Sequence, residues 1–404
     1  MLLYRFLVSA LAVKELGARA LRGDWSAVKA RLGRTHPPSD DSHVWLHAAS
    51  NGELASAKPV IAELANGGRD ILLTVNTDSA LHLARGWAMP NVTPVLATLD
   101  LTGPTRRMMS RWSVTAHITL ESDLWPNRIL HCPGPVIVLG GRLTERSAKS
   151  WKRFAPLAQK VLSRVSYLSA QDTGSKDRFL SMGLPQKSAG PVFDLKGLYT
   201  SPEAKPDPEL QQSFDRNETW LAASTHQGED EIVLNAHKKA LEKQPDLKLI
   251  LAPRHPKRAG TIADLIAASG LTVARRSLSQ NPRNVQVYLA DTLGEMHLWY
   301  ALAGITFVAG SLTDRGGHTP YEPAALNSAI IHGPDVANFR AAYERLEDAN
   351  AAKEIADADS LANALIEVLS SNLKDQMAQA AQRALKQDTD FPALMHDIVT
   401  TLDA

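Results

Sequence analysis

Residues 43–53 read HVWLHAASNGE, a short apolar run that leads through a polar turn into a helical sequence. A run of this length is typical of a strand buried on both faces, so we predict a strand over 43–49. The following Ser-Asn-Gly sequence predicts a turn, and Gly52 should let the backbone turn tightly into a helix over 53–65. The same strand–turn–helix pattern recurs along the chain, which predicts parallel sheets with helices on both faces.

The alternation of strands and helices continues through two halves of similar size. In the first half, the other predicted strands are 70–75, 92–97, 116–120, 135–139 and 167–169, and the helices are 78–85, 102–111, 147–162 and 174–182, with a helical stretch opening at 125–129. In the second half, the predicted strands are 219–223, 248–252, 272–275, 285–289, 305–308 and 329–332, and the helices are 229–243, 258–269, 294–303 and 323–326. Residues 360–404 are rich in alanine and predict a helical tail that packs against both halves.

A proline-containing stretch separates the two halves. Residues 200–212 hold prolines among charged residues, which favours a linker. We therefore predict an α/β fold with two Rossmann-like domains and an inter-domain cleft, since such sheets bind ligands beyond the carboxyl ends of their strands. The predicted parts are an N-terminal helical segment 1–34, a first Rossmann-like domain 35–199, the linker 200–212, a second Rossmann-like domain 213–385 and a C-terminal helical tail 386–404.

The composition is that of an ordinary globular protein. Of 404 residues, 44% are apolar and 22% are charged, which excludes a disordered, collagenous or multi-span membrane protein. The formal net charge is +1, so bulk charge gives no reason to expect a nucleic-acid partner. The single cysteine, Cys132, excludes an internal disulfide framework and a cysteine-rich metal site, and it fits a reducing compartment.

The N-terminus departs from this average. Residues 1–13 read MLLYRFLVSALAV, which is too short to span a bilayer and, without a clean cleavage site, is not typical of a signal peptide. Residues 1–34 contain seven basic and two acidic residues, and the apolar residues of the first eleven positions can share one helical face. Two interpretations stay open: a basic amphipathic helix on an anionic membrane surface, or an ordinary helix packed on the domain.

Acidic residues follow two of the predicted strands. Glu53 falls at the start of a helix, where backbone N–H groups should favour its charged form, and a carboxylate at a cleft edge can act as a general base. Residues 121–127 read ESDLWPN and follow the predicted strand 116–120. They could position a substrate beside Glu53, or Asp123 and Pro126 could simply cap the next helix. Glu53 itself could equally be a plain first-turn acid.

Polar turns in the second half point to an anionic ligand. Ser224, Thr225 and His226 lie between a predicted strand and a helix, where hydroxyls and backbone N–H groups can form an anion site. The alternative is a Ser/Thr cap with Glu229 in the first turn of the helix. Arg254 directly follows a strand, and its planar, always charged fork suits a phosphate or carboxylate, with a surface ion pair as the alternative.

The most unusual motif is residues 316–325, which read GGHTPYEPAA. The glycine pair permits close backbone approach to a ligand, whereas the alternative is a plain turn. His318 can donate a hydrogen bond to a phosphate or sugar oxygen, and Glu322 can accept from paired ribose hydroxyls. The sequence holds no P-loop, H-E-x-x-H or G-x-S-x-G motif, which argues against a P-loop NTPase, a metal site and a serine hydrolase.

Taken in order, these motifs resemble those of the Kdo (3-deoxy-D-manno-oct-2-ulosonic acid) transferases of Gram-negative lipopolysaccharide synthesis. The matching stretches run from about residue 44 to residue 339 and read HAASNGE, LESDLWPN, GRLTERS, ASTHQGEDEIVLNAH, LILAPRHP, VARRS, DTLGEMHLWYALA, FVAGSLTDRGGHTPYEPAAL and GPDVANF. The resemblance implies an inverting glycosyltransferase of the two-Rossmann GT-B architecture that needs neither a metal nor another cofactor. The basic apolar N-terminus also resembles the family's membrane anchor, although it is shorter.

The resemblance implies both substrates and a location. CMP-Kdo would be the donor and would bind mainly to the C-terminal domain. The acceptor, a lipid A precursor, would lie against the N-terminal domain and the membrane surface. The protein would act at the cytoplasmic face of the inner membrane, as a peripheral or monotopic protein. Arg254, His318 and helix N-termini could offset the charge of the leaving CMP.

The resemblance also implies roles for individual residues. Glu53 would be the catalytic base that takes the proton of the attacking hydroxyl, and Glu121 would be a second active-site carboxylate. The implied donor-side residues are Ser224, Thr225, His226, Arg254, Gly294, Glu295, Gly316, Gly317, His318 and Glu322. The implied acceptor-side residues are Ser50, Asn51, Gly52, Asp123, Trp125 and Arg142.

The chain departs from the family pattern at several positions. The family usually has a hydrophobic residue in place of Asn51 and an asparagine in place of Thr319. Residues 190–196 read GPVFDLK where the family has G-N-L-K-F-D, so Phe193 stands where a lysine is expected. Lys196 could replace that lysine from a shifted position, or the site could differ. These changes indicate a divergent member or a paralogue.

Two other functions stay open on the sequence alone. A GT-B enzyme of another chemistry, such as a nucleotide-sugar epimerase, would consume a nucleotide sugar without an acceptor or a membrane. A non-catalytic paralogue would bind a glycolipid without turnover, and the displaced lysine is its main support. The presence of Glu53, Arg254, His318 and Glu322 together favours an enzyme.

Overall fold

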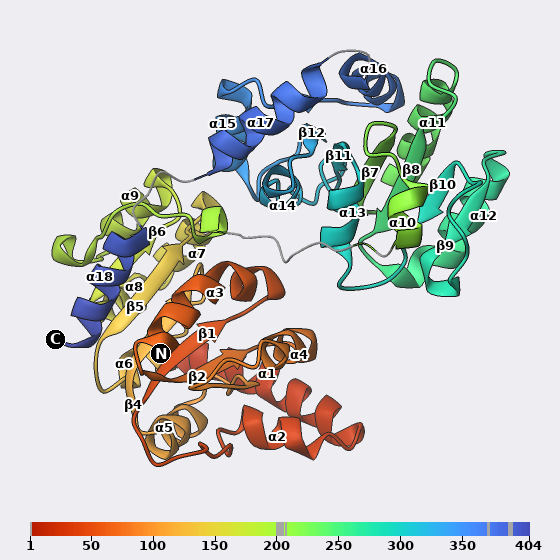
Figure 1. Ribbon diagram of the computed structural model, residues 1–404. Coiled ribbons are helices and arrows are strands. Elements are labelled where there is room, and N and C mark those ends of the chain that lie inside the picture. The colour runs from red at the N-terminus through yellow and green to blue at the C-terminus, as the bar shows by residue number, and fades with distance from the viewer. Residues whose placement is uncertain (1, 199–205, 207, 370–371, 387–390) are drawn as a thin grey trace. The chain divides into compact units, whose positions relative to one another are not determined.

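The computed structural model describes residues 2–198, 206, 208–369, 372–386 and 391–404 (Figure 1). The described residues divide into two compact units, 1–198 with 388–404 and 199–387. Each unit is built on one sheet of parallel strands with helices packed on both faces. The predicted α/β class with two Rossmann-like domains is therefore confirmed.

The sheet of the first unit has the strand order β3-β2-β1-β4-β5-β6, and every pair is parallel. Its strands are β1 (His43–Ala48), β2 (Asp70–Val75), β3 (Val92–Leu96), β4 (Val114–Leu120), β5 (Val136–Gly141) and β6 (Tyr167–Ala170). All six residues of β1 are buried, because helices cover both faces of this central strand. The strand order reverses between β1 and β4, so the loops after these strands flank the point where such sheets bind ligands.

Two apolar clusters lie on opposite faces of this sheet, because successive strand residues point to opposite sides. One cluster joins strand residues to α3 (Asn51–Asn66), α4 (Asp78–Gly86) and α18 (Phe391–Leu402). The other joins strand residues to α5 (Thr102–Arg111), α6 (Pro126–His131), α7 (Glu145–Lys152), α8 (Ala155–Leu162) and α9 (Thr173–Ser181).

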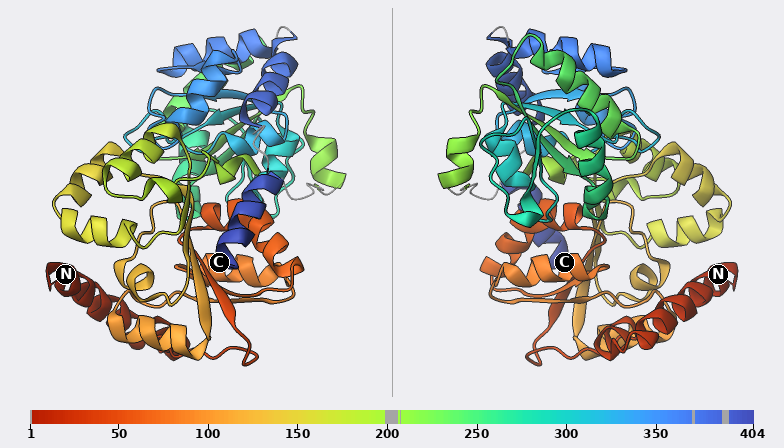
Figure 2. Two further views of the ribbon diagram at one scale, coloured as in Figure 1. Left: turned by 90° about the vertical axis from the view of Figure 1, so that its left-hand side faces the viewer. Right: turned by 90° about the vertical axis from the view of Figure 1, so that its right-hand side faces the viewer.

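The first unit begins with two helices, α1 (Leu2–Leu21) and α2 (Trp25–Arg31). Both views of Figure 2 show α1 on the periphery of this unit. Val8 and Ala12 of α1 are buried, whereas Leu11 and Leu21 are 61% and 91% exposed. One face of α1 thus packs on the unit, and another presents apolar side chains outward. Within the described part of the chain, every helix is too short or too polar to pass through a bilayer.

The sheet of the second unit has the order β13-β12-β11-β7-β8-β10-β9 and is also parallel throughout. Its strands are β7 (Thr219–Thr225), β8 (Lys248–Pro253), β9 (Val273–Arg275), β10 (Val287–Leu289), β11 (Ile305–Val308), β12 (Ala329–His332) and β13 (Ala352–Glu354). Its helices are α10 (Pro208–Ser213), α11 (Glu229–Leu241), α12 (Ala259–Ala268), α13 (Met296–Leu302), α14 (Tyr321–Ala325), α15 (Arg340–Asp348), α16 (Ala358–Leu369) and α17 (Leu373–Leu385). Here the order reverses between β7 and β11, so the loops after these two strands flank the ligand-binding point.

The structure differs from the predicted elements in a few places. The predicted helix 147–162 is two helices, α7 and α8, because the chain turns at Arg153 and Phe154. The end of the predicted linker is α10, which forms because Leu210 is buried against the second unit's core. Residues 200–205 and 207 of that linker lie outside the described residues. The helix α15 and the three-residue strand β13 were not predicted, since β13 is too short to show a periodic pattern.

The C-terminal tail divides between the units, as predicted. The helix α17 packs against β12 and α14 of the second unit, whereas α18 packs against α3 of the first. The helix α18 belongs to the first unit because its residues Leu394, Met395 and Ile398 are buried in a core cluster of that unit.

Candidate active site

Glu53 lies in the first turn of α3, directly beyond the end of β1. The Glu53 N–H donates to the Ser50 hydroxyl oxygen (3.2 Å), and the Glu53 carboxylate accepts from the Ala49 N–H (2.8 Å) and the Ser50 hydroxyl (3.3 Å). Ser50 is therefore the N-cap of α3, and the Glu53 carboxylate bends back over the turn to the residue before the cap. Asn51 and Gly52 open the helix. The prediction that Gly52 supplies a tight glycine turn is wrong, because its φ lies outside the left-handed region.

The environment of the Glu53 carboxyl group favours the protonated form. Burial, reinforced by the charges of Glu121 and Asp123, raises the pKa of Glu53 to about 8, and the hydrogen bonds from Ala49 and Ser50 oppose this only in part. The expectation that the helix start favours the charged form is therefore wrong, because burial and two neighbouring carboxylates outweigh it. A carboxyl group with a pKa near neutrality suits general acid–base chemistry at physiological pH.

The raised pKa of Glu53 predicts a pH-dependent stability. The folded chain holds a proton that the unfolded chain releases above its ordinary pKa of 4.5, so the free energy of unfolding falls as the pH rises from there to about 8. We expect Glu53→Gln to have a higher Tm than the wild type at pH 8.5, with the difference shrinking toward pH 5. Circular dichroism melts at both pH values measure this, with Glu63→Gln on the exposed face of the same helix as control. Equal Tm values at pH 8.5 would show that burial does not destabilise the Glu53 carboxylate.

Glu121 follows β4 and is joined by Lys196 from a distant part of the chain. Lys196 Nζ lies 2.7 Å from Glu121 Oε1, and the two side chains are only 16% and 17% exposed. Lys196 belongs to a short 3₁₀ turn, Leu195–Leu198, that packs against α3. Phe193, by contrast, is buried in the apolar core. Lys196, unlike Phe193, therefore presents its ammonium group to the Glu121 carboxylate.

His47 connects the loop after β4 to the strands beneath it. Its Nε2 lies 3.0 Å from Asp123 Oδ2, and its Nδ1 lies 2.9 Å from Thr74 Oγ1. Burial lowers the pKa of His47 to about 4, so the ring is neutral at physiological pH. Burial alone would raise the pKa of Asp123, but the bond from His47 and the charge of Arg128 bring it below its usual range. Asp123 does not cap α6, as was one alternative, because the N-cap is Trp125 and the first-turn N–H groups of Asn127 and Arg128 donate to the Asp100 carboxylate instead.

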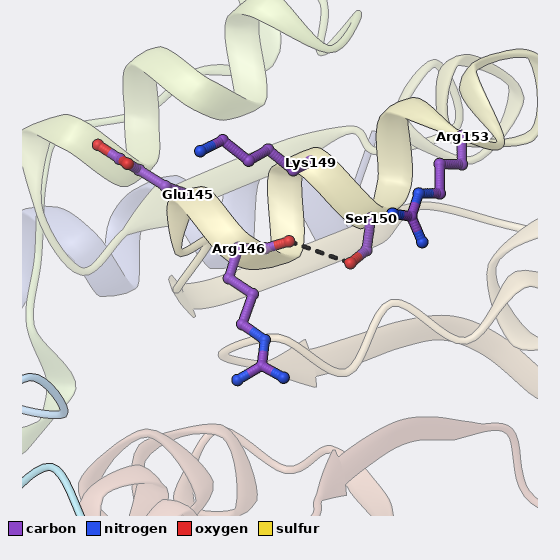
Figure 3. A pocket seen from close by; sticks show the side chains of 5 residues that line it. All are labelled: Glu145, Arg146, Lys149, Ser150 and Arg153. Atoms are coloured by element: carbon purple, nitrogen blue, oxygen red, sulfur yellow. Dashed lines mark hydrogen bonds between the residues drawn. The ribbon is translucent and has the colours of Figure 1, made fainter. Parts of the chain in front are cut away.

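Arg142 and the helix that follows it add cationic groups to the first unit. The Arg142 N–H donates to the Glu121 carbonyl oxygen (3.2 Å), so the loops after β4 and β5 run side by side. Three residues further on, α7 begins. A pocket of about 630 Å³ lies against α7 (Figure 3), and it is lined by Glu145, Arg146, Lys149, Ser150 and Arg153.

In the second unit, the carboxylate of Glu229 holds two loops together. Glu229 is completely buried at the start of α11. Its carboxylate accepts backbone N–H bonds from His226 (2.9 Å), Gly310 (2.8 Å), Ser311 (3.1 Å) and Leu312 (3.1 Å). It thereby ties the loop after β7 to the loop after β11, on both sides of the point where the strand order reverses. In the sequence, Glu229 can be recognised only as a first-turn acid, although the Gly-Ser pair at 310–311, which follows a predicted strand, is a possible sign of its partners.

The N-cap of α11 bears on one alternative for the turn after β7. This N-cap is Gly228, with φ +95° and no side-chain cap, so the alternative of a Ser/Thr cap is not supported. Within this turn, the His226 N–H donates to the protein's own Glu229 carboxylate. Ser224 forms a bulge at the end of β7 with φ +62°, and Thr225 is buried. The His226 N–H is therefore not available to an anionic ligand.

His226 and His318 form a stacked pair beside that turn. Their ring centroids lie 5.2 Å apart with planes 10° from parallel, and their Nε2 atoms are 3.0 Å apart. At that distance one ring donates the hydrogen bond and the other accepts it. Burial, with the nearby His226 and Arg254, lowers the pKa of His318 to about 4. The pair therefore offers neutral hydrogen-bonding groups rather than positive charge.

Arg254 supplies the positive charge next to the histidine pair. Its side chain is exposed, and its backbone N–H donates to the Thr225 carbonyl oxygen (3.0 Å). It forms no ion pair with any described residue, so the ion-pair alternative is not supported. Its charge lowers the pKa of both His226 and His318. The guanidinium group is therefore available to an anionic group of a ligand.

The glycine pair 316–317 is required by the backbone. Gly316 and Gly317 have φ values of +78° and +71°. A Cβ on Gly316 would lie 2.6 Å from the Asn338 side chain, and one on Gly317 would lie 2.9 Å from the Asp335 carbonyl oxygen. The Gly316 N–H also donates to Asp335 Oδ2 (2.6 Å). The glycines are thus needed because the segment around Asp335 and Asn338 packs closely against them. A close approach by a ligand was the expectation from the sequence.

Glu295 and Glu322 have contrasting environments. Arg276 Nη2 and Nε donate to Glu295 Oε1 and Oε2 (2.7 and 3.1 Å), which holds the pKa of Glu295 below its usual range. Gly294, just before it, has φ +85° and open space around it. Burial raises the pKa of Glu322, and a hydrogen bond with Tyr300 opposes this. Glu295 is therefore committed to an ion pair, whereas Glu322 forms none with a described cation.

The chain is similar in sequence to a family of known proteins. A family model described as 3-Deoxy-D-manno-octulosonic-acid transferase (kdotransferase) matches residues 26–197. The 3-deoxy-D-manno-octulosonic acid transferase of Haemophilus influenzae is 31% identical over 361 residues, which cover 85% of this chain and 83% of the relative. The probable mitochondrial 3-deoxy-D-manno-octulosonic acid transferase of Arabidopsis thaliana is 33% identical over 371 residues, with 86% and 83% covered.

Solved structures of low sequence identity share the fold. A glycosyltransferase from Rickettsia africae has a TM-score of 0.61 at 11% identity and covers 90% of this chain and 98% of that one. A UDP-GlcNAc 2-epimerase from Neisseria meningitidis has a TM-score of 0.61 at 12% identity, with 90% and 99% covered. These likenesses concern the fold alone, whereas the sequence relatives decide the family. The chain therefore belongs to the 3-deoxy-D-manno-octulosonic acid transferases, a family of glycosyltransferases.

Proposed function

We propose that the protein transfers Kdo from CMP-Kdo to a lipid A precursor, with inversion at the anomeric carbon and Glu53 as general base. The observation that carries this proposal is the group formed by Glu53, Glu121 and Lys196 where the strand order of the first sheet reverses. There, the Glu53 carboxylate can accept a proton, and the ammonium group of Lys196 compensates the negative charge of Glu121. Family membership supplies the substrate class.

The proposed reaction is a direct displacement. The acceptor hydroxyl oxygen attacks the anomeric carbon, its proton passes to the Glu53 carboxylate, and the bond to the CMP phosphate oxygen breaks with both electrons leaving on CMP. A pKa of about 8 means that a minority of Glu53 is ionised at neutral pH, but that fraction is a stronger base than an ordinary carboxylate. Glu121 sustains the high pKa, and Lys196 offsets the charge of Glu121.

Donor binding is assigned to the second unit. Arg254 would meet the CMP phosphate, and His318 would donate a hydrogen bond to a phosphate or sugar oxygen in exchange for its present bond with His226. Glu322 would accept from the ribose hydroxyls. The proposed reaction also requires that these donor-binding residues and the Glu53 group act on the same donor and acceptor molecules.

We further propose that the protein works at the cytoplasmic face of the inner membrane. The exposed apolar side chains of α1 and α2, including Leu21 at 91% and Trp25 at 61% exposure, support attachment through the N-terminal segment. Basic residues in the same segment would favour an anionic surface.

The test of the proposed function is whether CMP release depends on the acceptor. Purified protein with CMP-Kdo should release CMP only when a tetraacylated lipid A precursor is added. Release without acceptor would favour a nucleotide-sugar enzyme of other chemistry, such as an epimerase. Acceptor binding without any CMP release would favour a non-catalytic glycolipid-binding paralogue.

Lys196→Met should alter the pH dependence of transfer as well as its rate. Without the ammonium group, Glu121 repels the charged form of Glu53 more strongly, so the pKa of Glu53 should rise further. We expect kcat to fall about tenfold at pH 7 and the acidic limb of the pH–rate profile to move to higher pH. The matched control is Lys187→Met, an exposed lysine of the same region. An unchanged profile would remove Lys196 from the site.

A further inference from the structure

We propose that the cavity beneath α1 in the first unit binds a phosphate monoester through Arg128 and Arg31. The cavity has a volume of about 420 Å³ and lies between α1 and the segments that follow β2 and β3, with the start of α6 completing it. The inference rests on the proposed function in one respect: it assigns the phosphate to the glycolipid acceptor.

Arg128 is a buried cation with unmet hydrogen-bond donors. It is 2% exposed, and its Nη2 donates to the Thr98 carbonyl oxygen (2.9 Å). Its Nε and Nη1 are buried and have no acceptor among the described residues. The guanidinium also lies 5.5 Å from the ring centroids of Trp45 and Trp125. Stacking of this kind leaves the N–H groups at the guanidinium edge unsatisfied, and a bidentate oxyanion fits that edge.

The charges of Asp100 and Asp123 offset the burial of the Arg128 charge only in part, because burial still lowers the pKa of Arg128. Asp100 accepts from the backbone N–H groups of Asn127 (2.9 Å) and Arg128 (3.0 Å) and from the Tyr4 hydroxyl. Glu15 and Asp78 both pair with Arg19. No carboxylate of the described residues forms a salt bridge with Arg128. The cost of burying this charge is therefore offset only by acids at longer range, and an anionic ligand in direct contact would lower the cost further.

A second buried arginine faces the same cavity. Arg31 is 7% exposed and donates to the carbonyl oxygens of Ala97 (2.9 Å) and Asn76 (2.6 Å). These bonds fix the guanidinium at the ends of β2 and β3. Glu15 lies 3.4 Å from its Nε, and Asp78 acts on it at longer range. Two guanidinium groups held by backbone carbonyls form a rigid cationic wall, which suits a dianionic phosphate better than a single carboxylate.

The surroundings of the cavity favour a phosphate carried by an amphiphile. Val8 and Leu11 of α1 line it beside the arginines, so an apolar chain can follow the phosphate. Arg128 is also electrostatically coupled to the catalytic group, because it lowers the pKa of His47, which is hydrogen-bonded to Asp123. Asp123 lies within electrostatic range of both Arg128 and Glu53, so we assign the phosphate to the sugar that carries the attacking hydroxyl.

The test compares two acceptors in the wild type and in Arg128→Met. The acceptors are an acylated glucosamine disaccharide with a phosphate on the accepting sugar and the same molecule without that phosphate. We expect the wild type to prefer the phosphorylated acceptor about tenfold or more in kcat/KM, and Arg128→Met to lose most of that preference. Equal use of both acceptors by the wild type would overturn the inference. Transfer to neither acceptor would instead refute the proposed function.

A direct binding measurement separates the cavity from the reaction and from the source of the phosphate. With CMP at saturation, millimolar inorganic phosphate should raise the Tm of the wild type but not of Arg128→Met. No phosphate effect on the wild type, together with no acceptor preference, would overturn the inference. Stabilisation by inorganic phosphate without a preference for the phosphorylated acceptor would support the cavity as a phosphate site but contradict its assignment to the acceptor.

A second pair of variants guards against misfolding of Arg128→Met. Leu11 lies at the cavity and is 61% exposed, so Leu11→Glu can repel a phosphate without disturbing the core. Leu11→Gln is its neutral match. Leu11→Glu should lower the preference for the phosphorylated acceptor relative to Leu11→Gln, and equal preferences in the two would count against the inference.

Discussion

Glu53→Gln should lose transfer by a factor of about 10² to 10⁴ in kcat while it still binds CMP with unchanged affinity. The amide keeps the shape of the side chain and can still accept from the Ala49 N–H, so the turn at the start of α3 should persist. It cannot take the proton of the attacking hydroxyl. The effect should therefore fall on kcat for acceptor-dependent CMP release, measured with both substrates at saturation.

The control for this prediction lies on the same helix. Glu63→Gln changes an exposed carboxylate of α3 and should leave kcat within about twofold, since surface changes away from a site have small effects. Full turnover by Glu53→Gln, with CMP binding intact, would remove Glu53 as the base. A parallel loss of CMP affinity would point to a structural role instead.

Glu229→Gln should strongly lower the stability of the second unit, although the sequence marks Glu229 only as a first-turn acid. A glutamine side chain offers one acceptor oxygen in place of two, so at least two of four buried N–H groups lose their partner. Each unmet buried donor costs about 1–3 kcal/mol, so the free energy of unfolding should fall by about 2–6 kcal/mol. CMP affinity should fall with it, because the same carboxylate fixes the loop that carries His226.

The matched control is Glu231→Gln, two residues further along α11, where the carboxylate is exposed. Chemical denaturation and calorimetric titration with CMP measure the two expected effects. Unchanged stability in Glu229→Gln would mean that the four N–H groups find other acceptors. Reduced stability with full CMP affinity would confine Glu229 to a structural role.

Most of the fold could be predicted from the sequence because local patterns determine it. Short apolar runs such as 43–48 can be buried only as central parallel strands, and turn residues mark where each run ends. The errors fall where no periodic pattern exists or where tertiary contact decides. The break between α7 and α8 and the helix α10 are of this kind, because burial of Leu210 rather than local propensity stabilises α10.

The site could be predicted only in part. Glu53 and Glu121 could be predicted as site residues because acidic residues that follow predicted strands can be recognised in the sequence itself. The contact between Lys196 and Glu121 could not be predicted, because it depends on a 3₁₀ turn that packs on α3. The protonation of Glu53 was mispredicted for the same reason, since its pKa follows from burial and from a carboxylate 68 positions away rather than from its own helix. Arg128 gave no signal at all before its burial was known.

The most direct test of the central claim is the mass of the acceptor after reaction. Incubation of the wild type with CMP-Kdo and a tetraacylated lipid A precursor should add the mass of one or more Kdo residues to the acceptor. Glu53→Gln should leave the acceptor mass unchanged under the same conditions. Consumption of CMP-Kdo by the wild type with no change in acceptor mass would contradict the proposed transfer.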